Sequence, residues 1–388
     1  MGEDVSERLD VVPAQFSVIA TRRQKYACRS CEDVVVQAPA LPRLVEGGIP
    51  TEATVAHVLV SKYADHLPLY RQAQIYAHQS VNLDRSTLAD WVGKAAFLLR
   101  SVHERLFKRL KASDKLFADE TTAPVLDPGR GRTKTGQLFA YARDDRPWDG
   151  AEPPGVAYLY APDRKDENVV RHLQGFVGTL QVDGYVGYKA LADRMPSASR
   201  SAGRMSGASS TSSREPVRRR SPPRPSRALR RFTKSRPRSA VLSPRNVTPP
   251  GRSEAAPLPP RWSRGSGRSS ASSARRPSSL RPSAMPSRAK GLARFLDDGR
   301  IEIDNNVVER SIRPIALNRK NALFAGSDGG GEHWAVIASL VETCKLNGVD
   351  PQAYLADIII RIVNGHPQSQ IDELMPWAYA QPPLRAVA

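Results

Sequence analysis

The periodicity of hydrophobic residues separates short strands at the start of the chain from helices that follow them. In residues 1–47, QFSVIA alternates apolar and polar side chains, and YACRSCEDVVVQAP continues the strand-like pattern. Residues 48–112 change to a helical period, first with Val55, Val58, Leu59 and Tyr63, and then in LPLYRQAQIYAH and SVNLDRSTLADWVGKAAFLLRSVHERLFKRL. Ser86 is placed to cap the last of these helices.

Two interpretations of this helical region remain open. A helix, a short turn and a second helix, with Arg85, Ser86 and Thr87 at the start of the second, are typical of a helix-turn-helix that reads DNA. An ordinary helical bundle with Trp91 in its core has the same pattern. The region is therefore either a DNA-binding element or a part of the core.

A strand period begins at Lys115 and predicts a sheet. Strands are expected in KLFADETTAPVL, TGQLFAYARD and GVAYLYAPDR, then a helix in DENVVRHLQGF and a fourth strand in TLQVDGYVGY. Three strands in a meander, a crossover helix and a further strand make a mixed α/β sheet. A right-handed crossover makes the first and fourth strands neighbours, which brings Asp119 and Asp183 close together. We assign residues 113–193 to the first part of this domain.

Residues 291–330 contain a helix whose two faces differ. Its polar face carries Asn306, Glu309, Arg310 and Arg313, and its apolar face carries Val308, Ile312 and Ile315. We expect Asp304 to cap the helix and Pro314 to end it. A helix packed on the sheet in this way can direct Glu309 towards the two strand aspartates.

Residues 331–388 form a C-terminal helical element. AVIASLVETCKL is apolar on nearly all sides, as in a buried helix, and makes Cys344 a core residue. The next helix has Asp350 as cap, Pro351 at its first position, and Asn364 with Gly365 as its stop.

Composition sets one block apart from this patterned sequence. Residues 194–290 hold 22 Arg and 2 Lys against 2 Glu, together with 24 Ser and 15 Pro. The rest of the chain holds 34 basic and 37 acidic residues, so the whole excess of the net charge of +19 lies in the block. Such a segment cannot bury enough apolar surface to offset its ordering entropy, and we expect it to be disordered.

Two origins of the basic block are possible. It can be a nucleic-acid-binding segment of arginine-serine type. Alternatively, its Arg/Ser/Pro/Ala/Gly composition is what a GC-rich gene gives in a shifted reading frame, and the block begins and stops abruptly between patterned segments. We favour the frame shift.

The cysteines and the hydropathy argue against a zinc protein, a disulfide-rich secreted protein and a membrane protein. Cys28 and Cys31 form one CxxC, which is half of a zinc ribbon, and two ligands do not complete a tetrahedral site, so we expect no tight zinc. Three cysteines give no disulfide framework, which favours a reducing cytoplasm. The acidic start MGEDVSERLD is unlike a secretory signal, and no apolar run of about 18 residues could span a membrane.

Acidic residues on two strands and one helix suit a metal site. Asp119, Asp183 and Glu309 would offer hard oxygen ligands to two Mg²⁺ ions, which catalyse in-line phosphoryl transfer. Four basic residues on or after the same helix could neutralise phosphates of bound DNA: Arg310, Arg313, Arg319 and Lys320. Residue counting alone does not select these three acids from the 39 in the chain.

The local motifs resemble those of a known family. FADETTAPVLDPGRGRTKTGQLFAYARDDRPW, LQVDGYVGYKAL and DNNVVERSIRPIALNRKNALFAGSDGGGEHWAVIASLVETCKLNG closely resemble the transposases of the insertion sequence 66 family, as does YLADIIIRIVNGHPQSQIDELMPWAY. The resemblance implies an RNase H-like catalytic domain in which Asp119, Asp183 and Glu309 are the Asp-Asp-Glu triad. It further implies Mg²⁺-dependent cleavage of DNA at the element ends, attack of the freed 3′-hydroxyl on target DNA, and a homo-oligomer in the active state.

Two departures from the family predict an impaired copy. The family usually carries an N-terminal extension with the first CxxC of the zinc site, and a helical insertion where this chain has residues 194–290. We therefore expect a degenerate transposase with little strand transfer. The alternatives are a non-catalytic DNA-binding remnant of a transposase and an RNase H-like nuclease that does not transpose.

Overall fold

The computed structural model describes the following residues: 8, 15–27, 35–127, 129–182, 188, 299–302 and 304–379. Cys28, Cys31, Asp183 and the basic block of residues 194–290 lie outside these ranges. The predictions made for them therefore stay predictions.

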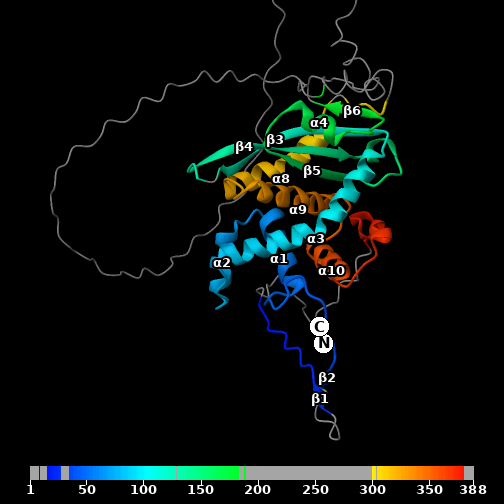
Figure 1. The fold of residues 1–388 in the computed structure, drawn as a ribbon. Helices are drawn as coiled ribbons and strands as arrows, with labels where there is room; N and C mark the ends of the chain where they lie inside the picture. Colours follow the sequence, from blue (N-terminus) through cyan, green and yellow to red (C-terminus); the bar gives the residue numbers. More distant parts are fainter. Residues whose placement is uncertain are drawn as a thin grey trace, which may run out of the picture. The chain divides into compact units, whose positions relative to one another are not determined.

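A four-stranded sheet forms the centre of the fold, in the order β5-β4-β3-β6 (Figure 1). β3 (Lys115–Asp127) pairs antiparallel with β4 (Arg132–Arg143) and parallel with β6 (Thr179–Val182). β5 (Gly155–Ala161) pairs antiparallel with β4, and α4 (Asp166–His172) connects β5 to β6. The predicted mixed α/β sheet, with the first and fourth strands as neighbours, is confirmed.

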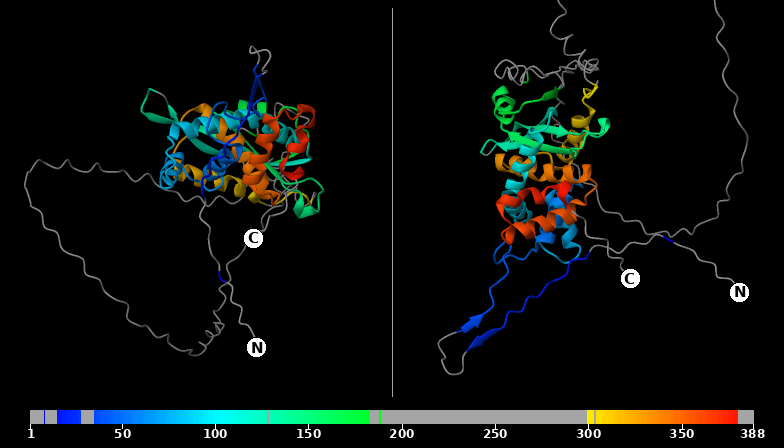
Figure 2. Two further views of the ribbon diagram at one scale, coloured as in Figure 1. Left: turned by 90° about the horizontal axis from the view of Figure 1, so that it is seen from below. Right: turned by 90° about the vertical axis from the view of Figure 1, so that its right-hand side faces the viewer.

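Helices cover both faces of this sheet (Figures 1 and 2). On one face, the His172 ring of α4 lies edge-on to Phe139 and Tyr141, with ring centroids 5.3 and 5.9 Å away. The other face carries α8 (Asn306–Ala322) and α9 (Asp328–Leu346). β4 is followed by a short 3-10 turn, η1 (Arg146–Trp148).

The helical prediction for residues 48–112 is confirmed by three helices: α1 (Glu52–Tyr63), α2 (Leu69–Ala77) and α3 (Arg85–Lys111). The prediction that Ser86 caps the third helix was wrong, because the backbone is extended at Asp84, which makes Asp84 the N-cap and places Ser86 inside the first turn. Trp91 is only 3% exposed, as the bundle interpretation expects. The helix-turn-helix interpretation stays a prediction.

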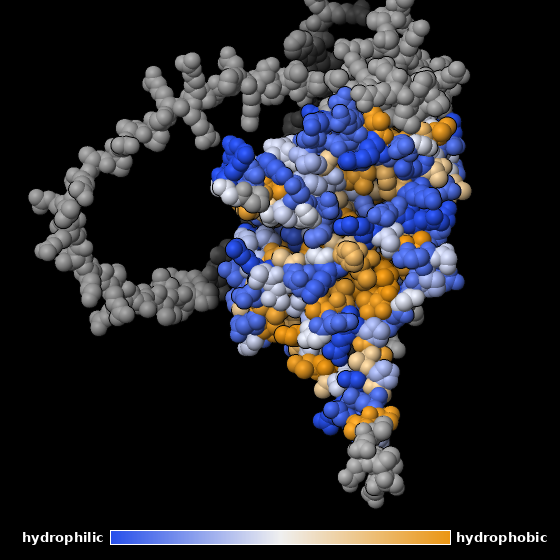
Figure 3. Space-filling model, in the orientation of Figure 1, coloured by the Kyte–Doolittle hydropathy of each residue, from blue (hydrophilic) through white to orange (hydrophobic). Residues whose placement is uncertain are grey.

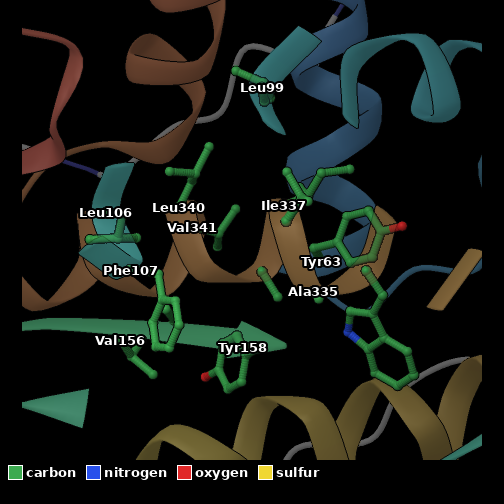
Figure 4. Packing of buried hydrophobic residues seen from close by; sticks show 14 of the residues in the cluster. Tyr63, Leu99, Leu106, Phe107, Val156, Tyr158, Ala335, Ile337, Leu340 and Val341 are labelled. Carbon is green, nitrogen blue, oxygen red and sulfur yellow. The ribbon is translucent and has the colours of Figure 1, made fainter. Parts of the chain in front are cut away.

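α9 is buried between α1 and α3 on one side and β5 on the other. Figure 4 shows Ile337, Leu340 and Val341 of α9 between Leu99 of α3 and Val156 of β5. This arrangement joins the helical region and the sheet in one hydrophobic core, and it confirms the prediction of a buried helix. Cys344 is fully buried in the same helix, as predicted.

Side chains from α9 and α3 satisfy the hydrogen-bonding groups along the outer edge of β5. Thr343 Oγ1 accepts from the Val156 N–H at 3.1 Å and donates to the Val156 carbonyl at 3.0 Å. Ser339 Oγ accepts from the Tyr158 N–H at 2.8 Å, and His103 Nε2 lies 2.9 Å from the Tyr158 carbonyl oxygen. Because an open strand edge invites pairing with other chains, this cover allows β5 to be both an edge strand and buried.

Two details of α8 differ from the sequence predictions. Pro314 lies inside the helix and does not end it. Proline removes the hydrogen bond to the carbonyl four residues earlier, and here that carbonyl belongs to exposed Arg310, where water can replace the lost donor, while buried Ile315 keeps the helix on the sheet. The N-cap position belongs to Asn305, and Asp304 instead accepts from the Asn306 N–H at 3.2 Å.

The C-terminal region follows the predicted pattern. Asp350 caps α10 (Pro351–Val363) through the N–H groups of Gln352 and Ala353, and Gly365 continues from its end with φ 86°. η3 (Gln368–Leu374) and η4 (Pro376–Ala378) come next. Arg105 and Arg109 of α3 both hydrogen-bond Asp372, which lowers the pKa of that carboxyl and fixes η3 against α3.

The N-terminal strands are β1 (Lys25–Ala27) and β2 (Val35–Gln37), which lie in the segment YACRSCEDVVVQAP as predicted and pair antiparallel. The strand predicted in QFSVIA was wrong: residues 15–20 form no strand and their side chains are exposed, so no packed face supports the alternating pattern. Within the described ranges, no helix combines the length and the apolar character needed to cross a membrane.

Candidate active site

Asp119 lies on the sheet face that α8 covers. It pairs with Ala140 of β4, which pairs with Tyr158 of β5, and directly paired residues point to the same face of a sheet. The Tyr158 hydroxyl donates to the Ser311 carbonyl of α8 at 2.5 Å. Asp119 is half-buried, and its Oδ1 accepts from the Glu120 N–H at 2.8 Å. The carboxyl is therefore held in place within β3, between the buried residues at the start of the strand and buried Ala123.

The strand that leads to Asp183 ends beside Asp119. β6 is parallel to β3, and its last residue, Val182, is in register with Ala118. Asp183 follows Val182 in the sequence and lies outside the described residues. The structure thus brings together the two strands of the predicted pair, and the position of the second carboxylate stays a prediction.

The start of α8 is attached to both of these strands. Asn305 Nδ2 lies 3.4 Å from the Ala118 carbonyl oxygen of β3, next to Asp119. Gln181 Nε2 of β6 donates to the carbonyls of Glu302 at 2.9 Å and Asp304 at 2.5 Å. These contacts fix the segment before α8 beside Ala118 of β3 and at the end of β6, where the candidate acids are expected.

Glu309 lies in the first turn of α8, one turn after Asn305, whose carbonyl accepts from its N–H at 3.1 Å. Glu309, Arg310, Arg313 and Lys320 are all exposed, as the predicted polar face requires. None of the four makes an ion pair or a side-chain hydrogen bond with any other residue that the structure describes. The Glu309 carboxylate is thus available as a ligand, and the three basic side chains are available to an anion.

Arg319 differs from the other basic residues of α8 because it holds the helix to the sheet. Its Nη1 donates to Thr121 Oγ1 at 3.2 Å and to the carbonyl and hydroxyl of Thr122, each at 2.6 Å. Just beyond α8, Ala325 pairs with β3 through hydrogen bonds to Pro124 and Leu126. α8 is thus attached to β3 at both ends, and Arg319 has a structural contact that its sequence motif did not indicate.

Sequence reasoning missed a charged group beside the start of α8. Glu302 is half-buried, and its pKa is raised, first by burial and then by the negative charges of Asp304 and Asp144, against the opposing charge of Lys115. Asp144 is also largely buried, but hydrogen bonds from Arg146 outweigh that burial and lower its pKa. No spacing signal marks these residues, because they meet only through the packing of α8 on the sheet.

Glu120, the neighbour of Asp119, points to the opposite face. Its side chain is only 5% exposed and forms an ion pair with Arg164, which follows β5. Strand alternation separates the two acids of the ADET motif, so Glu120 is a structural partner of the loop before α4.

The carboxylates offer the ligand type that Mg²⁺ prefers. Within the described ranges, no three His, Cys, Asp or Glu side chains are gathered closely enough to hold a metal ion. Asp183, the third member of the predicted set, is not among the described residues. Accordingly, the donor chemistry fits Mg²⁺, and the full ligand set stays a prediction.

Sequence comparisons identify the protein family of the chain. The family described as Transposase IS66 family matches residues 47–202 and 268–333, the IS66 C-terminal element matches 339–377, and the zinc-finger binding domain of transposase IS66 matches 1–32. The chain belongs to the IS66 transposase family.

Its relatives in Sinorhizobium fredii (strain NBRC 101917 / NGR234) span most of the chain. The uncharacterised protein y4qI is 44% identical over 406 aligned positions, which cover 98% of this chain and 72% of the relative. The uncharacterised protein y4jD is 40% identical, with 97% and 75% covered, and y4hP is 33% identical, with 98% and 71% covered. No solved structure matches the chain.

Proposed function

We propose that this protein is a DNA transposase whose catalytic site is made by Asp119, Asp183 and Glu309. The observation that carries the proposal is the double attachment of the segment before α8, to Ala118 of β3 and to Gln181 of β6. It supports the proposal because it holds the start of Glu309's helix beside Ala118, the neighbour of Asp119 in β3, and beside β6, which ends one residue before Asp183.

The catalytic domain is RNase H-like in this proposal. Three antiparallel strands, a helix, and a fourth strand parallel to the first support that assignment, as does the packing of α8 on the first strand. Gln181 lies on the face that α8 covers, because it pairs with Phe117, two residues before Asp119. If the parallel pairing continues by one residue, Asp183 lies beside Asp119 on that face.

In the reaction, the three carboxylates hold divalent ions, and the basic side chains hold DNA. When bound, two Mg²⁺ ions stabilise the attacking and leaving oxygens of in-line phosphoryl transfer. Arg310, Arg313 and Lys320 are exposed and are assigned to DNA phosphates, at the element ends and in the target. Cleavage would free a 3′-hydroxyl that attacks the target strand, with a homo-oligomer bringing the two ends together.

This copy is proposed to be impaired. The family match is interrupted over residues 203–267, inside the basic block and between Asp183 and Glu309 in the sequence. A displacement of about 1 Å in a catalytic group can reduce the rate on the order of a hundredfold. A segment in this interval that the family model does not match would lower strand transfer in this way. Tight zinc is not expected from Cys28 and Cys31 alone.

A chimera tests this proposal. Residues 203–267 are replaced by the aligned segment of y4qI, and both proteins are given Mg²⁺, target DNA and a donor DNA carrying the gene with its flanking sequence. We expect the chimera to join donor ends to target, and the natural chain to do so at least about a hundredfold more slowly. Equal rates would contradict the impairment, and a chimera that keeps its activity after Glu309→Gln would contradict the catalytic assignment.

A non-catalytic DNA-binding remnant is the second candidate, favoured by the same interruption of the family match. This candidate predicts DNA binding without divalent ions and no metal affinity that depends on Asp119 or Glu309.

Reading the gene in all three frames across codons 194–290 separates the two possible origins of the basic block, since a frame shift requires a helical pattern in another frame.

A further inference from the structure

The strand ends on both sides of the turn between β3 and β4 form a projecting arm, residues 126–127 and 129–134, that the site described above does not use. Leu126 pairs with Thr133, and Asp127 pairs with Arg132, so the two strands stay paired up to the turn. Figures 1 and 2 show the arm extending beyond the sheet, and residues 129–133 are all exposed. A two-stranded ribbon that extends into solvent buries little apolar surface, so packing alone does not explain it.

The base of the arm is held on both strands. On the β3 side, Ala325 hydrogen-bonds Leu126 at 2.8 Å. On the β4 side, Lys134 Nζ lies 2.6 Å from Asp328 in the first turn of α9, and Tyr160 donates to the same carboxylate at 2.6 Å. These contacts fix the direction of the arm before any partner binds.

Two glycines allow this close packing at the base. A Cβ on Gly136 of β4 would lie 2.6 Å from the Tyr160 hydroxyl, and a Cβ on Gly331 of α9 would lie 2.6 Å from the Tyr160 ring. Either would force Tyr160 away from Asp328. The arm is therefore a built feature of the fold, supported by residues from β4, β5 and α9.

The free end of the arm is basic. Lys134 is occupied by Asp328, and Arg130 lies only loosely beside Asp127, at 3.7 Å. Arg132 makes no ion pair or side-chain hydrogen bond within the described part of the chain. Thr133 next to it is exposed and adds a hydroxyl. The end of the arm thus offers two guanidinium groups on a narrow ribbon, which Figure 3 colours as hydrophilic.

The arm continues the line of basic residues that begins at the candidate active site. α8 runs along β3 from Ala118 to Leu126, and its exposed Arg313 and Lys320 lie along the helix between Glu309 and the end of α8 that is next to the arm. Asp127 is eight residues along β3 from Asp119, or about 26 Å at roughly 3.3 Å per residue. DNA carries one phosphate per strand about every 3.4 Å, so this distance corresponds to about eight base pairs.

We propose that the arm binds the phosphate backbone of duplex DNA about eight base pairs from the cleaved bond, through Arg130 and Arg132. The inference rests on the proposed function, because that function places DNA at Glu309. A two-stranded β-ribbon also fits the major groove of a DNA duplex, which favours duplex DNA over a protein partner.

The salt dependence of DNA binding tests the arm in the full chain, because the variants compared share the same basic block. Arg130→Gln with Arg132→Gln removes two phosphate contacts, so the slope of log K against log salt should become shallower by about 1.8, at roughly 0.9 per contact. The matched control is Lys165→Gln with Arg171→Gln, which removes two exposed charges at α4, on the sheet face opposite α8. Both variants change exposed side chains, and circular dichroism verifies their folding.

A photocrosslinker locates the contact. Benzoylphenylalanine at position 133 should crosslink to a labelled DNA duplex at least about threefold more than at exposed position 167 on α4, and crosslinking should map to the groove or backbone on one side of the cleavage point. Equal slopes for the arm and control variants, or equal crosslinking at 133 and 167, would overturn the inference. Stronger crosslinking to a protein than to DNA would also overturn it.

Failure of this inference can be told from failure of the proposed function. If the arm variants leave the salt slope and the crosslinking unchanged while metal binding at Glu309 is intact, only the proposal for the arm fails. If no metal binds but the arm variants change the salt slope and the crosslinking as expected, the catalytic assignment fails and the arm is still a DNA contact.

Discussion

α8 and α9 cover the same face of the sheet, but they are built differently. α9 is apolar nearly all round, and its buried hydroxyls at Ser339 and Thr343 bond the backbone of β5. α8 is amphipathic: Ile315 and Val308 are buried, while Glu309 and Arg313 are exposed. α8 is attached to β3 through polar contacts near its two ends.

The difference shows that one helix serves stability and the other can serve chemistry. A helix buried on all sides can contribute packing energy but presents no side chain to a substrate. A helix attached at its ends can present a polar face with a fixed direction, which is what a metal ligand needs. We therefore expect changes in α9 to alter the free energy of unfolding and changes around α8 to alter metal and DNA binding.

The largest expected effect on stability comes from the core of α9. Leu340→Ala removes a fully buried side chain and should reduce the free energy of unfolding by about 2–5 kcal/mol. Leu317→Ala on α8, where the leucine is 48% exposed, should change it by less than about 0.5 kcal/mol. Urea denaturation measures both. Similar losses for the two variants would remove the contrast between the helices.

The next effect is a pH dependence of stability from buried histidine. Burial lowers the pKa of His103 to about 4, and the pKa of His172 also to about 4. The unfolded chain binds these protons near pH 6.5, so stability is full above that pH and falls as the pH decreases from about 6.5 to 4, by up to roughly 3 kcal/mol per histidine.

Unfolding curves at a series of pH values check this. His103→Gln should remove up to roughly 3 kcal/mol of the loss between pH 6.5 and 4, and His78→Gln, which changes an exposed side chain on the C-cap of α2, should leave the loss unchanged. A His103→Gln variant with the full pH dependence would show that His103 is protonated in the folded state.

A somewhat smaller loss is expected at the covered edge of β5. Thr343→Val keeps the shape but leaves the Val156 N–H and carbonyl buried without partners, which should reduce stability by about 2 kcal/mol. Thr343→Ser keeps the hydroxyl and should lose less than half as much. A loss for valine no larger than that for serine would mean that the two hydrogen bonds contribute no more to stability than the methyl group does.

The smallest effect on stability, and the most informative for function, is at the attachment of α8. Gln181→Met removes both hydrogen bonds to the segment before the helix and should reduce stability by about 1 kcal/mol while weakening Mn²⁺ binding about tenfold. Gln352→Met removes a single side-chain hydrogen bond, to the Ala53 carbonyl of α1, and should leave Mn²⁺ binding unchanged. Equal effects of the two variants on Mn²⁺ would contradict a positioning role for Gln181.

Much of the fold followed from periodicity in the sequence. The strands, the buried α9 and the cap at Asp350 were predictable, because each depends on a pattern within a few residues. The neighbouring positions of β3 and β6 followed from the right-handed crossover between parallel strands. The long run of α8 through Pro314 was not, because the packing that overrides the proline comes from β3, nearly 200 residues earlier.

The candidate site was predictable to a different extent. Asp119 and Glu309 came from a family resemblance, since nothing in their spacing separates them from other acids. The attachment of α8 by Asn305 and Gln181, and the contact of Arg319 with Thr122, have no local signal, because each joins residues far apart in the chain.

Binding of Mn²⁺ in place of Mg²⁺, followed by electron paramagnetic resonance on the full chain, tests the central claim most directly, because it does not depend on strand transfer. We expect about two ions per chain, and at least tenfold weaker binding in each of Asp119→Asn, Asp183→Asn and Glu309→Gln. Glu332→Gln, which changes an exposed acid of α9, should bind as the natural chain does. Unchanged Mn²⁺ binding in all three site variants would contradict the account.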